Sequence, residues 1–224
     1  MNIFDYKAIV FDLDGTLIET GEEITDGLND TLRDMSLKTI NSELVCTWIG
    51  LGTKTLFVEA LAYIKKESVE DIEKSAYFDE AYGIFKKYYN KRCATKSKPY
   101  EGVIEVLNTL KTKNIKLAVM TNKEAIFTNK ILSLHNMSNL FDCTISGDTL
   151  EVKKPNPKGV FYIANKLNVE VDDMLFVGDS SIDIKTARNA NIPVWAMNYG
   201  YNMGQDIKNS NPDRVFDFFI DILK

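Results

Sequence analysis

Short apolar runs separated by helical patterns constrain this chain more than any other feature. Four runs rich in β-branched and aromatic residues are typical of buried parallel strands, at 7–11, 116–120, 174–177 and 194–197. Residues 143–146 form a weaker fifth candidate. Apolar residues at helical spacing fill 103–110, 126–134 and 160–167. This alternation predicts an α/β fold with a doubly wound, Rossmann-like parallel sheet.

The pattern changes between the first strand and Pro99. Residues 18–95 show helical spacing, clearest at 53–66 and 68–92, and Ser68 with Asp71 is typical of a helix start. We interpret the aromatic residues of 68–92 as the packed interior of this segment. The sequence therefore predicts a helical insertion at 18–95 within a core of 1–17 and 96–224, with hinges near 18–20 and 96–99.

Charge and rare residues exclude several functions. The 224 residues carry 27 Lys and Arg against 32 Asp and Glu, a net charge of −5, which argues against nucleic-acid binding. His135 is the only histidine, so a Ser-His-Asp triad or a multi-histidine zinc site is hard to build. Three scattered cysteines indicate free thiols. With no signal or membrane-spanning pattern, we expect a soluble, cytoplasmic protein that acts away from membranes, as a monomer or homodimer.

Polar residues follow four of the predicted strands, where the carboxyl ends of parallel strands meet at one edge of the sheet. They are Asp12 and Asp14, Thr121 with Asn122, Lys154, and Asp179 with Asp183. Each alone has an ordinary explanation as a turn, a helix cap or a solvated charge. Two carboxylates two residues apart at a buried strand end are costly, however, unless a cation or a reaction requires them.

These segments resemble the four ordered motifs of the haloacid dehalogenase superfamily. The matching residues are 12–16, Thr121, 154–157 and 178–183, and the helical insertion matches the C1-type cap of that superfamily. Residues 47–52 and 199–202 resemble the phosphoglycolate phosphatase group within it. The resemblance covers essentially the whole chain.

The resemblance implies a role for each carboxylate. Asp12 would attack phosphorus and form an aspartyl-phosphate, while Asp14 would protonate the leaving alkoxide and then activate water. It also implies a Mg²⁺ site made by Asp12, the backbone carbonyl of Asp14, and Asp179, with Asp183 orienting a bound water.

Substrate contacts are expected from both the core and the cap. Thr121, the amide of Asn122 and Lys154 would hold the phosphoryl group. Gly15 and Thr16 would let the chain turn sharply beside the phosphate. In the cap, the turn 50–54, with Gly50, Gly52 and Lys54, would suit a second anionic group such as the carboxylate of 2-phosphoglycolate.

We therefore expect a Mg²⁺-dependent phosphomonoester hydrolase acting on a small phosphorylated metabolite, with 2-phosphoglycolate as the leading candidate. An inorganic pyrophosphatase or another small-metabolite phosphatase would share every catalytic residue. A phosphosugar mutase is disfavoured, because residues 22–27 lack the cap histidine that such mutases commonly use. A non-enzymatic scaffold is disfavoured because no carboxylate of the motifs, nor the lysine, is missing.

Overall fold

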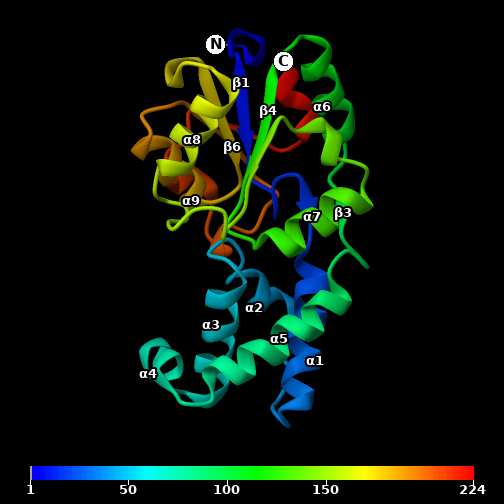
Figure 1. Cartoon of the computed structure of the whole chain (residues 1–224), viewed down its shortest axis with the longest axis vertical. Coiled ribbons are helices and arrows are strands. Elements are labelled where there is room, and N and C mark those ends of the chain that lie inside the picture. The colour runs from blue at the N-terminus through cyan, green and yellow to red at the C-terminus, as the bar shows by residue number, and fades with distance from the viewer. Residues whose placement is uncertain (1) are drawn as a thin grey trace.

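The computed structural model describes residues 2–224 and consists of an α/β core with a helical cap below it (Figure 1). Six parallel strands form the core sheet in the order β5-β4-β1-β6-β7-β8. Their bounds are β1 Ala8–Phe11, β4 Lys116–Met120, β5 Cys143–Ile145, β6 Met174–Gly178, β7 Val194–Met197 and β8 Arg214–Phe216. The predicted doubly wound parallel sheet is confirmed, and β8 is a strand that the sequence pattern did not indicate.

Alternate residues of each strand enter two separate apolar layers. In β1, Ile9 and Phe11 face the cluster that contains α6 (Val103–Thr112), α7 (Ala125–Leu134) and the final turn η6 (Phe219–Leu223). Ala8 and Val10 face the cluster formed with α8 (Lys158–Leu167) and α9 (Ser181–Asn189). The sheet is therefore covered on both faces, which explains why its strands are apolar throughout.

The cap contains five helices between two short antiparallel strands. The helices are α1 Gly21–Asp34, α2 Ser42–Cys46, α3 Thr53–Lys65, α4 Val69–Lys74 and α5 Phe78–Arg92. The strands β2 (Ile18–Glu19) and β3 (Lys98–Pro99) pair where the chain leaves and re-enters the core. The domain limits at 18 and 95 remain a proposal based on the sequence.

One predicted helix is divided in two. Residues 68–92 contain α4 and α5, separated at Ser75, whose backbone is extended and whose hydroxyl donates to the Ile72 carbonyl. A serine that bonds to the preceding turn competes with helix continuation, which accounts for the break. The predicted cap at Ser68 is confirmed, because its hydroxyl accepts the amide of Asp71.

Short 3₁₀ turns complete the chain. They are η1 Ile3–Asp5, η2 Ser138–Leu140, η3 Val171–Asp173, η4 Asn202–Gly204 and η5 Ile207–Ser210. Across residues 2–224, no helix is both long and apolar enough to cross a bilayer.

Candidate active site

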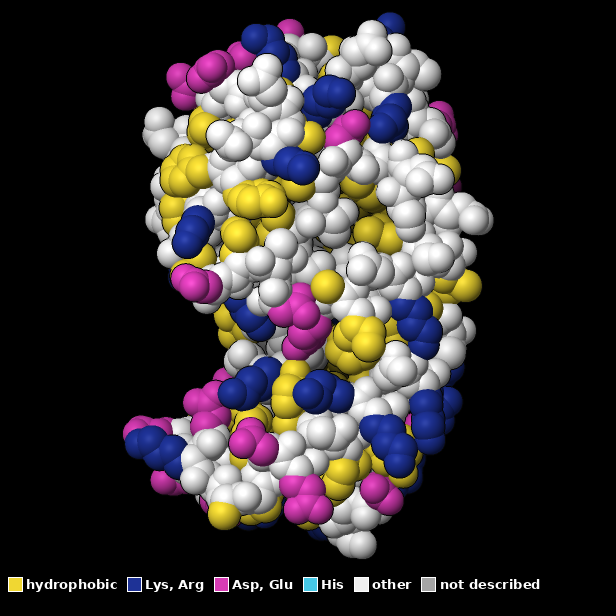
Figure 2. Space-filling model, viewed as in Figure 1, with side chains coloured by type: hydrophobic (Ala, Val, Ile, Leu, Met, Phe, Trp, Pro, Cys, Tyr) yellow, Lys and Arg dark blue, Asp and Glu magenta, His cyan; other side chains and the backbone are white. Residues whose placement is uncertain are grey.

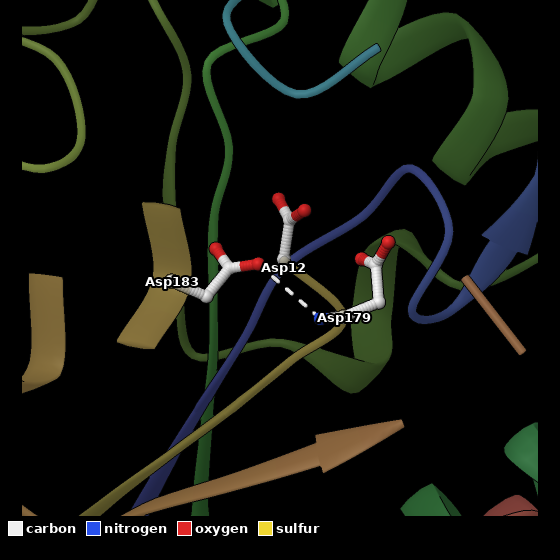
Figure 3. Close-up of side chains that lie close together, drawn as sticks. All are labelled: Asp12, Asp179 and Asp183. Atoms are coloured by element: carbon white, nitrogen blue, oxygen red, sulfur yellow. Dashed lines mark hydrogen bonds between the residues drawn. The ribbon is translucent and has the colours of Figure 1, made fainter. Parts of the chain in front are cut away.

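Three carboxylates meet at the carboxyl edge of the sheet (Figure 3). Asp12 directly follows β1, Asp179 directly follows β6, and Asp183 is in the first turn of α9. An oxygen atom from each lies within 4.8 Å of the others, and all three residues are buried. Neighbouring strands thus bring together residues that are more than 160 positions apart in the sequence.

The ammonium of Lys154 is held between two of these carboxylates. Its Nζ lies 2.6 Å from Asp12 Oδ1 and 2.7 Å from Asp183 Oδ1. Burial raises the pKa of Asp12 to about 7; Lys154 opposes this rise and Asp183 adds to it. Burial acts to lower the pKa of Lys154, but Asp12 and Asp183 outweigh it and raise that pKa above its usual value. Lys154 therefore remains an ammonium beside the candidate nucleophile.

Asp183 organises the loop between β6 and α9. Its Oδ2 accepts hydrogen bonds from Ser180 Oγ at 2.6 Å, from Ser180 N at 3.0 Å and from Asp179 N at 3.2 Å. Ser180 caps α9, since its hydroxyl oxygen accepts the amide of Asp183. Because both oxygens of Asp183 already have protein partners, its carboxylate is well placed to fix the positions of Asp179 and Lys154.

Asp179 is held from two sides. Its Oδ1 accepts Thr16 Oγ1 at 2.7 Å, and its Oδ2 accepts the amide of Tyr201 at 2.7 Å. Burial, together with Asp183 and Asp12, raises the pKa of Asp179 well above its usual value. Gly15 has φ +87°, and a Cβ there would lie 2.4 Å from Asp179 Oδ2.

Gly15 and Thr16 contact Asp179 in this structure, and their predicted part in binding the substrate stays a prediction. Neither residue lines the pocket described below; both pack against Asp179 instead. Glycine is needed at position 15 for the turn and for the close approach of this carboxylate.

Asp14 lies apart from the carboxylate cluster. Its Oδ1 accepts the hydroxyl of Thr20 at 2.6 Å and lies 3.1 Å from Nζ of Lys123. Burial acts to lower the pKa of Lys123, but Asp14 and its other neighbours outweigh it and raise that pKa. The contact between Lys123 and Asp14 was not predicted from the sequence. Lys123 lies just before α7, which begins at Ala125 with Glu124 as its cap residue. A lysine directly after Thr121 and Asn122 was the available signal for this contact.

Asn122 connects the core motifs to the cap. Its side chain accepts the amide of Lys154 at 2.9 Å and donates to the carbonyl of Gly50 at 3.0 Å. Thr121 accepts the amide of Lys123 through Oγ1. The side chain of Asn122 thus fixes the loop that contains Lys154, which leaves the expected phosphate contact to its backbone amide.

A small pocket lies between these loops and the cap. It is lined by Asp12, Asp14, Ile24, Ile49, Gly50, Gly52, Thr53, Leu56, Thr121, Asn122 and Lys123. On one side the surface is hollowed between the core and the cap (Figure 2). Thr53 Oγ1 donates to the Glu124 carboxylate at 2.5 and 2.6 Å, and Tyr82 Oη donates to it at 2.8 Å. Both contacts hold cap helices against the core.

Lys54 is not part of this pocket. Its side chain is exposed, and its Nζ lies 5.4 Å from the centre of the Phe78 ring, in a different groove from the catalytic carboxylates. Lys54 does not reach this pocket in the present structure, and its contact with substrate stays a prediction. Gly50 and Gly52 do line the pocket, so the backbone at the start of α3 is the part of the predicted turn that reaches it.

The donor set of the carboxylate cluster fits a hard divalent cation. Asp12, Asp179 and Asp183 are buried carboxylates, and the single ammonium of Lys154 contacts two of them. Burial is the main cause of the raised pKa of Asp12 and of Asp179, and the negative charge of Asp183 adds to both rises. Oxygen-only ligands that leave room for water suit Mg²⁺.

Comparison with known families agrees with this site. Residues 9–197 match the model for the haloacid dehalogenase-like hydrolase family. The chain belongs to this family. Relatives align over the full length of the chain. A phosphoglycolate phosphatase from Colwellia psychrerythraea is 37% identical over 100% of this chain and 98% of its own. One from Haemophilus influenzae is 36% identical over 97% of both chains.

Solved structures of the family share the whole architecture. A crystal structure described as that of a predicted phosphoglycolate phosphatase from Haemophilus somnus superposes with a TM-score of 0.90 at 33% identity, covering 99% of this chain and 98% of that one. The similarity includes the cap as well as the core, and it confirms the resemblance inferred from the four motifs.

Proposed function

We propose that this protein is a Mg²⁺-dependent phosphomonoester hydrolase that converts 2-phosphoglycolate and water into glycolate and phosphate. The observation that carries the proposal is the placement of Asp12 and Asp14 on one pocket with separate cationic partners, Lys154 and Lys123. Two carboxylates in different environments can take different roles, one as nucleophile and one as acid and base. The names of the full-length relatives support the substrate.

Asp12 is the nucleophile. A carboxylate oxygen attacks phosphorus, the bond to the substrate's ester oxygen breaks, and an aspartyl-phosphate forms. Lys154, 2.6 Å from Asp12, offsets the negative charge that the phosphoryl group brings. Thr121 and the backbone amide of Asn122 line the same pocket and hold the transferring oxygens.

Asp14 moves the protons. It donates one to the leaving alkoxide, and it then takes one from the water that hydrolyses the aspartyl-phosphate. Such acid–base assistance contributes roughly 10²–10⁴-fold to rate. Because its Oδ1 is held by Thr20 and Lys123, its other oxygen is the one free to exchange the proton.

Asp12, Asp179 and the backbone carbonyl of Asp14 would hold Mg²⁺, and Asp183 would fix their surroundings. When bound, the ion supplies the positive charge that allows a phosphate dianion to enter a site rich in carboxylates. The chain's own contribution is to hold Asp179 rigidly through Thr16 and Tyr201.

The pocket favours a small substrate with a second polar end. Ile24, Ile49 and Leu56 close it on the cap side. Backbone amides at the start of α3, next to Gly52, replace Lys54 as the group that receives the glycolate carboxylate. We propose that the protein acts in the cytoplasm, as a monomer or homodimer, on a free metabolite.

Phosphate release across a substrate panel tests this proposal. The panel contains 2-phosphoglycolate, pyrophosphate, glucose phosphates, a nucleoside monophosphate and 4-nitrophenyl phosphate, each with and without Mg²⁺, with Asp12→Asn as the blank. We expect a kcat/KM for 2-phosphoglycolate at least about tenfold above the others, about 1.4 kcal/mol of transition-state preference. Preference for pyrophosphate or another ester would overturn the substrate, and absence of Mg²⁺-dependent turnover would overturn the reaction.

A further inference from the structure

Lys123 joins the candidate acid–base residue to the cap. Its side chain is only 2% exposed, with Nζ 3.1 Å from Asp14 Oδ1 and 2.6 Å from the hydroxyl oxygen of Tyr89. Tyr89 is in α5 of the cap and is itself fully buried, with its ring 4.5 Å from that of Phe127 in the core. A charge buried this deeply needs good partners, and this lysine has one from each part of the molecule.

Both groups that hold Asp14 do so through the same oxygen. Thr20 donates to Oδ1 at 2.6 Å, and the Lys123 ammonium lies against Oδ1 as well. Since Asp14 also lines the pocket, these contacts restrain the rotation of the carboxyl group and leave Oδ2 as the oxygen available for proton transfer. A rotation of the carboxyl group would move that oxygen away from the leaving group, and geometry is what general acid catalysis requires first.

Both holding groups are also attached to the cap. Thr20 is the residue before α1, and its amide donates to the hydroxyl of Tyr201. Lys123 is attached through Tyr89, against which Gly27 of α1 packs so closely that a Cβ at Gly27 would lie 2.9 Å from the Tyr89 Cα. Helices α1 and α5 are therefore packed directly against each other beside Asp14.

We propose that Lys123 is a positioning residue that aligns Asp14 for proton transfer when α5 places the Tyr89 hydroxyl against its ammonium. This inference rests on the proposed acid–base role of Asp14. The contact between Lys123 of the core and Tyr89 of the cap then has a part in the chemistry. When the cap covers the substrate, this contact completes the alignment of Asp14 as the proton donor.

The dependence of kcat/KM on the leaving group distinguishes this positioning role of Lys123 from a role in which Lys123 only neutralises buried charge in the fold. The alkoxide of 2-phosphoglycolate needs a proton to leave, whereas 4-nitrophenolate leaves without one. The quantity to compare is kcat/KM, since it reports phosphoryl transfer to Asp12 and is independent of the later hydrolysis step. The ratio of the two kcat/KM values is also independent of how much of a variant is folded.

In Lys123→Met, we expect kcat/KM for 2-phosphoglycolate to fall at least about tenfold more than kcat/KM for 4-nitrophenyl phosphate, within the range that acid catalysis supplies. With the aryl substrate, kcat and KM should fall together, because hydrolysis of the aspartyl-phosphate still needs Asp14. Tyr89→Phe should change the ratio in the same direction by about threefold or more. The matched control Lys113→Met, an exposed lysine far from the pocket, should leave the ratio at the wild-type value.

An equal fall for both substrates, or no fall, in Lys123→Met overturns the inference. If that variant does not fold, as judged by circular dichroism, Tyr89→Phe decides the matter, and an unchanged ratio overturns the inference. Failure of the proposed function gives a different result, because the wild-type protein would then hydrolyse neither substrate above the Asp12→Asn blank.

Discussion

Replacing Lys154 by methionine should destabilise the fold in a pH-dependent way. Lys154 Nζ lies 2.6 and 2.7 Å from carboxylates of Asp12 and Asp183, and its side chain is 2% exposed. Removing one partner of a buried ion pair costs about 3–5 kcal/mol, because the remaining charge is left uncompensated. Methionine retains most of the side-chain volume, so the loss reflects charge more than packing.

The pH dependence follows from Asp12. Its pKa in the folded protein, about 7, lies above the value of about 4 in an unfolded chain, so its protonated form favours the fold. This contribution to stability is fully present below about pH 4 and is lost as the pH rises through about 7. Without Lys154, which lowers this pKa, the loss continues to higher pH, and each added unit of pKa is worth about 1.4 kcal/mol.

Urea unfolding of metal-free protein at about pH 5.5 and about pH 8.5 measures the effect. We expect the deficit of Lys154→Met to be larger at the higher pH by about 1–2 kcal/mol, and we expect Mg²⁺ to restore part of it there. The control is Lys153→Met, which changes the exposed neighbouring lysine. A deficit that is the same at both pH values, or below about 1 kcal/mol at both, would refute this account of the cluster.

Three further changes test other contacts. In Gly147→Ala, a Cβ would lie 2.1 Å from the Asn122 carbonyl oxygen, so the backbone at Asn122 must shift. Steady-state kinetics should then show kcat/KM reduced by about 10²-fold, and an unchanged value contradicts the proposed role of the Asn122 amide. Thr53→Val removes the hydroxyl bonded to Glu124, so the amides of residues 49–53 should exchange hydrogen about tenfold faster, which corresponds to a loss of roughly 1.4 kcal/mol in the free energy of local opening. An unchanged exchange rate would mean that other contacts hold the cap against the core. Tyr201→Phe leaves the amides of Thr20 and Gly21 without their acceptor, and urea unfolding should show a loss of about 1–3 kcal/mol; a stability equal to wild type would mean that water replaces the hydroxyl.

The core and its four motifs were predictable because their signals are local. The apolar run before Asp12 identifies a buried strand, and parallel strands necessarily place Asp12 and Asp179 at one edge. The same applies to Ser68, whose capping role depends on Asp71, three positions away.

Contacts made by the cap could not be predicted in the same way. Neighbouring helix residues point about 100° apart, so Thr53 contacts Glu124 while Lys54 lies over Phe78. The sequence indicates the helix but not its rotation about its own axis relative to the core. The pair of Lys123 and Tyr89 joins residues 34 positions apart on separate units, and nothing local indicates it.

The paired strands at the base of the cap have an evolutionary consequence. Because Ile18–Glu19 and Lys98–Pro99 lie side by side, the whole cap leaves and returns through one narrow neck. An ancestor could therefore lengthen, shorten or exchange this segment without reordering the six strands or displacing Asp12, Lys154 or Asp179. Cap and core are encoded in stretches of the gene that can diverge at different speeds, and the Tyr89 contact with Lys123 is a point at which the two must change together.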